Sequence, residues 1–265
     1  MTDHQSPAAN HTIPRVNILG VGISVTNLSH AARFLIERAR AGRGGYVNIC
    51  TVHSIIEAQD DPKLRQILNQ SLLSTPDGMP LSWIGWASGF KSMDRTYGPD
   101  LLLKILRDTE GSGLAHYFYG GNEGVAAELA HRMRQRFPAI GIAGFGMPPF
   151  RPLTDDERAE LIERLGQSSP AFVWVGISTP KQDRLIAELS PQLPQAIFIG
   201  VGAAFDFHTG RVKQAPGWIQ RAGLEWFFRL TREPGRLWKR YLHTNPRFIF
   251  WYLLQWLGWK KFPLA

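Results

Sequence analysis

The chain has 265 residues, 44% of them hydrophobic and 20% charged, which is ordinary for a globular protein, and its one cysteine excludes an intrachain disulfide framework. Its formal net charge of +8 is unevenly placed, because residues 211–265 hold 11 of the 30 lysines and arginines but only two of the 22 acids. The same segment holds six of the nine tryptophans. These counts predict a charge-balanced main domain followed by a basic, aromatic appendage.

Residues 1–14 are polar and contain no apolar segment of the kind that a secretory signal needs, so we expect a disordered leader. From residue 15 onward, apolar runs typical of strands alternate with helical patterns. The runs lie at residues 15–25, 45–50, 71–76, 115–120, 139–146, 171–178 and 195–207, the first being a strand or hairpin and the last a strand broken at Gly202. Such alternation predicts an α/β fold with a mainly parallel, Rossmann-like sheet covered by helices on both faces. We place this core at residues 15–215 and a helical appendage at residues 216–265.

Parallel α/β sheets bind ligands at the carboxyl ends of their strands. Polar or glycine-containing turns follow the predicted strands at that edge, at Thr51, Asp77, Gly120-Gly121, Ser178-Thr179 and Asp206. Every loop after a strand reaches this edge, so position alone only permits a binding role.

Asp77 is the most isolated of these side chains along the sequence. In "LLSTPDGMPLSWIGWASGF" (72–90) it stands between two apolar runs, with no other charged residue within ten positions on either side. A catalytic carboxylate is one interpretation. The other is a turn residue that caps the following helix, which is a common use of aspartate.

Two further turns are candidates for substrate binding. "YGGNEG" (119–124) puts Gly120 and Gly121 between a strand and a helix, where backbone N–H groups can hold a phosphate, although a tight turn is the commoner role of so short a pattern. "GISTPKQDR" (176–184) would project Gln182 from a helix start towards the same edge. An ordinary helix start with a solvated glutamine is the alternative.

The stretch "GVGAAFDFHTGRVKQAPGWI" (200–219) places Asp206 between two phenylalanines. An acid there could orient backbone groups or bind sugar hydroxyls, and capping of the turn at residues 209–210 is the alternative. The histidines show no metal-ligand spacing, and the chain contains neither a G-x-S-x-G elbow nor a Walker-type P-loop.

The appendage is expected to consist of helices broken at Pro234-Gly235 and at Asn245-Pro246. Its apolar run at residues 248–259 is too short to span a bilayer, and tryptophan and tyrosine flanked by lysine and arginine are typical of a helix lying on an anionic membrane surface. Packing on the core, or on a second subunit of a homo-oligomer, is the alternative. Nucleic acid is disfavoured as a partner, because so many large apolar side chains favour lipid.

Several of these stretches together resemble the WecG/TagA/CpsF family of bacterial glycosyltransferases, glycosyltransferase family 26. The most specific are "TPDGMPL", "GISTPKQDR", "GVGAAFDFHTGRVKQAP" and "GLEWFFRLTREPGR", and the resemblance covers most of residues 15–240. It implies transfer of a sugar from a UDP-sugar to a polyprenyl-diphosphate-linked sugar at the inner face of the cytoplasmic membrane.

The resemblance also implies roles for single residues. Asp77 would be the general base that takes the proton of the acceptor hydroxyl in an inverting displacement, and an acid without an arginine neighbour would keep its basicity. Arg95, in "DRTYGPD", would stabilise the leaving phosphates. The remaining matched positions would bind substrate or shape the pocket, namely Thr51, Gln182, Asp206, Arg229, Arg232 and Arg236.

No metal or other cofactor is implied, because the chain lacks a D-x-D motif and the resemblance is to metal-independent transferases. The sequence around "TVHSIIEAQDDP" favours the exopolysaccharide, xanthan-type branch, with glucose or N-acetylmannosamine as the sugar transferred. A non-catalytic scaffold that binds a nucleotide-sugar or a membrane with the same fold is the alternative function.

Overall fold

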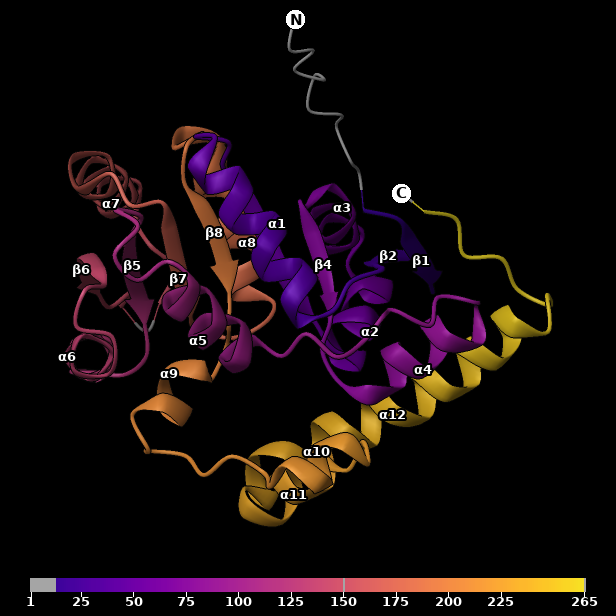
Figure 1. Cartoon of the computed structure of the whole chain (residues 1–265). Coiled ribbons are helices and arrows are strands. Elements are labelled where there is room, and N and C mark those ends of the chain that lie inside the picture. The colour runs from indigo at the N-terminus through magenta and orange to yellow at the C-terminus, as the bar shows by residue number, and fades with distance from the viewer. Residues whose placement is uncertain (1–12, 150, 265) are drawn as a thin grey trace, which may run out of the picture.

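The computed structural model describes residues 13–149 and 151–264, so the expected leader lies almost entirely outside the described residues (Figure 1). The described chain opens with a hairpin of β1 (Arg15–Ile18) and β2 (Val21–Ser24), paired antiparallel. Leu19 and Gly20 form its turn with φ of 53° and 79°. Two positive φ angles are what a two-residue turn between twisted strands requires. Of the two expectations for residues 15–25, the hairpin is confirmed.

Six strands form one parallel sheet, in the order β4-β3-β8-β7-β5-β6. Their bounds are β3 (Gly45–Cys50), β4 (Leu73–Pro76), β5 (Ala115–Gly120), β6 (Gly141–Gly146), β7 (Phe172–Gly176) and β8 (Ile197–Gly200). Each lies within a predicted apolar run, and the predicted α/β fold with a parallel sheet is confirmed.

Helices cover both faces of this sheet (Figure 1). One face packs on α1 (Leu28–Arg40), α5 (Gly98–Asp108) and α6 (Val125–Arg136), around the buried rings of Phe118 and Trp174. The other packs on α7 (Asp155–Ser168) and α8 (Lys181–Leu189), with the short 3-10 helix Ser190–Gln192 after them. A third apolar cluster joins the hairpin to α2 (Val52–Asp60), α3 (Pro62–Gln70) and α4 (Met79–Ala87) beside β4.

Residues 204–208 form the short helix α9 (Ala204–His208), so the expectation of a strand through residue 207 was wrong. The strand β8 ends at Gly200, and Gly202 has a φ of 55°, which turns the chain out of the extended conformation. A short apolar run has no periodicity that separates strand from helix, which explains the error.

The appendage forms α10 (Gly217–Arg221), α11 (Glu225–Arg232) and α12 (Pro234–Trp256). A break predicted at Pro234-Gly235 lies one position earlier, because α11 ends at Arg232 and α12 begins at Pro234. The predicted break at Asn245-Pro246 was wrong, because α12 continues through Pro246. A proline inside a helix removes one backbone hydrogen bond. Here Thr244 and Phe248 on either side of Pro246 are buried where α12 packs on α2, and this packing offsets the loss.

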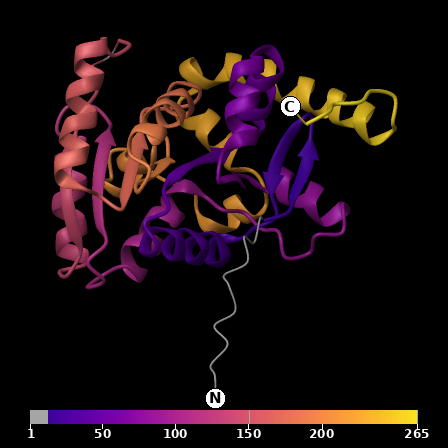
Figure 2. The ribbon, with the colours of Figure 1, turned by 90° about the horizontal axis from the view of Figure 1, so that it is seen from above.

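The end of the chain returns to the hairpin, where Figure 2 shows the two lying side by side. The Asn17 side-chain amide donates to the Phe262 carbonyl at 2.7 Å. The Gln255 side chain accepts from the Leu19 backbone N–H at 2.8 Å and donates to the Asn17 carbonyl at 3.0 Å. These contacts tie the appendage to the N-terminal part of the core across the whole length of the sequence.

Candidate active site

A cleft of about 1920 Å³ opens at the carboxyl ends of β3, β4, β7 and β8. The core supplies its floor through the turns after these strands and through α4 and α9. The appendage helices α10, α11 and α12 lie across this edge of the sheet (Figure 1). Residues of all three helices line the cleft. Core and appendage therefore build one site together.

Most of the predicted site residues line this cleft, namely Thr51, Asp77, Arg95, Gly121, Gln182, Asp206 and Arg229. Gly120 and Arg232 are not among the residues that line it. Arg236 belongs to the first turns of α12, and its side chain lies outside what the structure describes.

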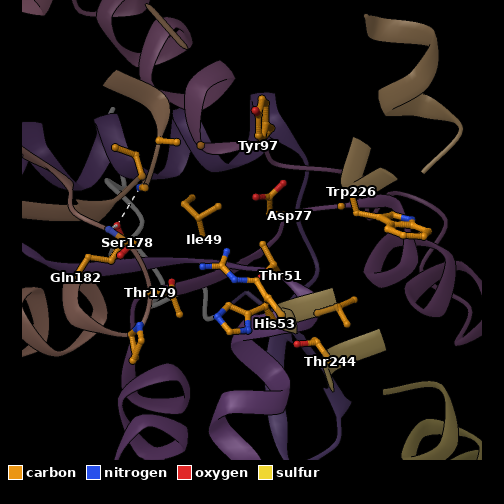
Figure 3. Close-up of a pocket in the computed structure, with 18 of the residues that line it drawn as sticks. Ile49, Thr51, His53, Asp77, Tyr97, Ser178, Thr179, Gln182, Trp226 and Thr244 are labelled. Carbon is orange, nitrogen blue, oxygen red and sulfur yellow. Dashed lines mark hydrogen bonds between the residues drawn. The ribbon is translucent and has the colours of Figure 1, made fainter. Parts of the chain in front are cut away.

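Asp77 is held at the end of β4 by its backbone N–H, which donates to the Cys50 carbonyl at 2.8 Å. The helix that follows starts at Gly78, whose φ is 100°, and has no side-chain capping bond, so the interpretation of Asp77 as a helix cap was wrong. Its side chain faces the open part of the cleft and is 16% exposed (Figure 3). A carboxylate in this place is available to a substrate.

Asp77 is not without a cationic neighbour, contrary to the expectation from the sequence. Its Oδ1 atom lies 3.5 Å from the Nε atom of Arg95, which is only 11% exposed. Burial raises the pKa of Asp77 to about 7, a rise that Glu225 reinforces and that Arg95 and Arg229 oppose. Desolvation rather than isolation from arginines therefore keeps this acid basic.

Both terminal nitrogens of the Arg95 guanidinium group are bound by other side chains. Nη1 donates to the Gln220 side-chain oxygen at 2.5 Å, and Nη2 forms an ion pair with Glu225. The group also lies 3.9 Å from the centre of the Tyr97 ring, at cation–π distance. Gln220 and Glu225 belong to the appendage, so the appendage holds this arginine in place.

Tyr97 and His53 also line the cleft, although the sequence analysis gave neither residue a role. The Tyr97 hydroxyl is buried and has no hydrogen-bond partner in the part of the chain that the structure describes, and burial raises its pKa far above the ordinary value. Burial lowers the pKa of His53 to about 4, which leaves its imidazole neutral at pH 7. Tyr97 stands two positions after Arg95 in "DRTYGPD", which is the signal that would have found it.

Thr51 sits at the floor of the cleft as the first capping residue of α2 (Figure 3). Its hydroxyl accepts from the Ser54 backbone N–H at 3.2 Å, and the Ser54 hydroxyl accepts from the Thr51 N–H at the same distance. This capping box fixes the start of the helix that carries His53 into the cleft.

Gln182 is buried, so its interpretation as a solvated side chain at an ordinary helix start was wrong. Its side-chain oxygen accepts from the Ser178 N–H at 3.2 Å and from the Gly202 N–H at 2.9 Å. The turns after β7 and β8 are thereby tied together at the cleft floor. Ser178 has a φ of 96°, an uncommon conformation for a residue with a side chain.

At positions 120 and 121 the surrounding chain leaves no room for a side chain, so both residues must be glycine. A Cβ on Gly120 would meet the Gly176 carbonyl oxygen at 2.5 Å, and one on Gly121 would meet Val125 at 2.6 Å. The Gly121 N–H donates to the Gly176 carbonyl at 2.9 Å, so it is occupied within the protein. These contacts favour the tight-turn interpretation of "YGGNEG".

Asp206 lies on α9, partly buried at the edge of the cleft rather than at a strand end. Arg229 reaches the same region from α11, with its guanidinium 5.9 Å from the centre of the Phe207 ring. Arg232 lies on the outer part of α11, exposed and 5.4 Å from the centre of the Phe228 ring. Of the two predicted appendage arginines whose side chains the structure describes, Arg229 lines the cleft and Arg232 does not.

The appendage exposes an unusual number of large apolar side chains. These are Trp218, Leu224, Trp226, Phe227, Trp238, Leu242, Ile249, Phe250, Leu253, Trp256, Leu257, Trp259 and Leu264. Trp226, Ile249, Leu253 and Trp256 of this set also line the cleft, as do Met79 and Trp83 of α4. In the described ranges, no helix has the length and apolar character needed to cross a bilayer, and no three metal-ligating side chains gather at one place.

Comparison with known proteins identifies a family model and a curated relative that match most of the chain. The model of the Glycosyl transferase WecG/TagA/CpsF family matches residues 16–262, which includes almost all of the appendage. A Bacillus spizizenii protein named N-acetylglucosaminyldiphosphoundecaprenol N-acetyl-beta-D-mannosaminyltransferase is 30% identical over 207 residues, 78% of each chain.

Proposed function

Because this chain belongs to the WecG/TagA/CpsF family of glycosyltransferases, we propose that it moves a sugar from a UDP-sugar to a polyprenyl-diphosphate-linked sugar. The observation that carries the proposal is Asp77, a carboxyl group with a raised pKa that faces a deep cleft between core and appendage. A base with a pKa near 7 is suited to proton transfer at neutral pH.

The proposed reaction is a single inverting displacement. The acceptor hydroxyl oxygen attacks the anomeric carbon of the donor while Asp77 takes the hydroxyl proton. A new C–O bond forms to the acceptor, the bond from the anomeric carbon to the phosphate oxygen breaks, and UDP leaves with the bonding electrons. One base within hydrogen-bond reach of the hydroxyl is sufficient for this chemistry.

Cationic side chains would offset the charge of the diphosphates. Arg229 lines the cleft on the appendage side, and Arg95 contributes its charge although both of its terminal nitrogens are already bound. Fixed cations in a site of low dielectric stabilise developing negative charge without reorganising. Because these cations could offset the charge of the diphosphates, we propose that the reaction needs no metal ion.

The apolar part of the cleft suits the lipid part of the acceptor. Ile249, Leu253 and Trp256 of α12 and Met79 and Trp83 of α4 all line it. We propose that the first isoprene units lie here, so that the diphosphate and sugar point inward towards Asp77. The exposed aromatic side chains of α11 and α12, among basic residues, would rest on the anionic inner face of the cytoplasmic membrane.

The relative's name specifies N-acetylmannosamine as the transferred sugar. Our proposal for this chain is exopolysaccharide or other cell-surface polysaccharide synthesis, with UDP-glucose and UDP-N-acetylmannosamine as the two donors to separate. UDP release from a panel of UDP-sugars, with and without a synthetic polyprenyl-diphosphate-linked sugar, makes that separation. Acceptor-dependent release from one donor supports the proposal, whereas binding of a UDP-sugar without release from any donor would indicate the non-catalytic scaffold.

A further inference from the structure

The ion pair between Arg95 and Glu225 joins two parts of the molecule that are 130 positions apart in sequence. Arg95 belongs to the core segment before α5, and Glu225 lies in the first turn of α11 in the appendage. Both side chains are largely buried, at 11% and 16% exposure. A pair so shielded from water interacts more strongly than one on an exposed surface.

The guanidinium group of Arg95 faces two carboxylates, those of Glu225 and Asp77. Glu225 and Gln220 take the two terminal nitrogens, while the Nε atom is left facing Asp77 at 3.5 Å. An arginine bound to a carboxylate in the ordinary way uses two nitrogens at hydrogen-bond distance. Asp77 does not receive this contact, because the appendage already occupies the nitrogens that would make it.

We propose that Glu225 is a positioning residue for the transfer reaction: it holds the far end of Arg95 and so prevents that guanidinium from clamping the Asp77 carboxylate, which stays free to accept a proton. This inference rests on the proposed role of Asp77 as the base. The appendage would then have a second role besides lining the cleft, because the basicity of Asp77 in the core would depend on Glu225 in the appendage.

Besides Glu225, other charged and titratable groups act on Asp77 and must be held constant in a test. They are Cys50 of β3, Arg95 and Tyr97 before α5, Asp100 of α5, and Arg229 of α11. Glu225→Gln removes the charge of Glu225 at nearly the same side-chain size and replaces its ion pair with Arg95 by, at most, a weaker hydrogen bond to a neutral group. Loss of the charge leaves Arg95 free to attract Asp77 more strongly.

The test is a direct titration of the Asp77 carboxyl carbon by NMR in protein labelled with ¹³C at the aspartate side chain, with the Asp77→Asn variant identifying the signal. In Glu225→Gln we expect the titration midpoint of Asp77 to fall by about one pH unit. The alkaline plateau of the transfer rate should fall with it, because a weaker base accepts the proton less readily. Glu225→Asp, which keeps the charge, should lie between the wild type and Glu225→Gln.

Glu160→Gln is the matched control, because Glu160 pairs with Arg164 on α7 and does not line the cleft. It should leave the Asp77 midpoint unchanged. An unchanged midpoint in Glu225→Gln would overturn the inference. If that variant does not fold, Gln220→Ala removes the other partner of Arg95 and should lower the midpoint by a smaller amount, and no shift there would overturn the inference equally.

The titration of Asp77 needs no catalytic turnover, so the positioning role of Glu225 can be tested even if the transferase proposal fails. A wild-type protein that releases no UDP from any donor would contradict the transferase proposal while the Asp77 signal still reports on Glu225. An active wild type whose Asp77 midpoint ignores Glu225 would contradict only the positioning role.

Discussion

The Oδ1 atom of Asp77 lies 3.5 Å from the Nε atom of Arg95, near enough for attraction but beyond a good hydrogen bond. The two side chains come from neighbouring segments of the core and meet at the floor of the cleft. Burial of the carboxyl group outweighs the attraction, so the pKa of Asp77 is raised to about 7 instead of lowered. This balance between desolvation and charge determines how the site responds to pH.

The transfer rate should rise with pH through the region of the Asp77 pKa. The base works only when ionised, and an acid with a raised pKa is still largely protonated at pH 6. We expect log kcat to climb with a slope of about 1 below pH 7 and to level off above it. A rate that is constant from pH 5.5 to 8 would show that no group with this pKa limits the reaction.

Asp77→Asn should stabilise the fold while it removes activity. A carboxyl whose folded pKa is raised binds its proton more readily in the folded state, so its contribution to stability is lost as pH rises from its unfolded pKa towards about 7. We expect the variant to melt about 2–4 °C above wild type at pH 8, and by less at pH 5. Asp108→Asn, at a partly exposed helix pair with Lys104, is the control and should show no such pH-dependent gain.

Arg229→Gln should lower kcat by about 10–100-fold, because it removes a cation that lines the cleft near the proposed diphosphate. Arg221→Gln removes the same charge from an exposed position on α10. With a detergent-dispersed acceptor, Arg221→Gln should keep the wild-type rate. Equal losses in the two variants would mean that net charge, and not the position of Arg229, supports the reaction.

The double substitution Trp256→Ser and Trp259→Ser should weaken sedimentation with anionic vesicles by about tenfold or more. Both side chains are highly exposed, at 72% and 75%, near the end of α12. Phe145→Ser removes an exposed aromatic side chain from β6 in the core and serves as the control. Loss of vesicle binding in that control to the same extent would argue against the appendage as the membrane-binding surface.

The order of the strands' apolar runs was enough to predict the parallel sheet and the edge at which Asp77 would lie. Alternation of strand and helix is a local property, and Asp77 directly follows its strand. The contacts that give Asp77 its character were not predictable in this way. Arg95 meets Gln220 and Glu225 from segments more than 100 positions away, and no local pattern encodes that meeting.

Two other local interpretations failed for a similar reason. The alternative of a solvated Gln182 at an ordinary helix start was wrong, because its oxygen accepts from two backbone N–H groups, one of them at Gly202 on a distant loop, which fits the predicted role of shaping the pocket. Pro246 was predicted to break a helix that tertiary packing of Phe248 keeps intact. Local preference was overruled in each case by contacts formed only in the folded chain.

The most direct test of the central claim is acceptor-dependent release of UDP by wild type and by Asp77→Asn, measured at pH 8 with the donor that the panel identifies. If Asp77 is the base, the variant should lose at least about 100-fold in kcat, because general base catalysis contributes a factor of that order. Its melting temperature, measured in parallel, should not fall. A correctly folded Asp77→Asn protein that releases UDP as fast as wild type would contradict the mechanism.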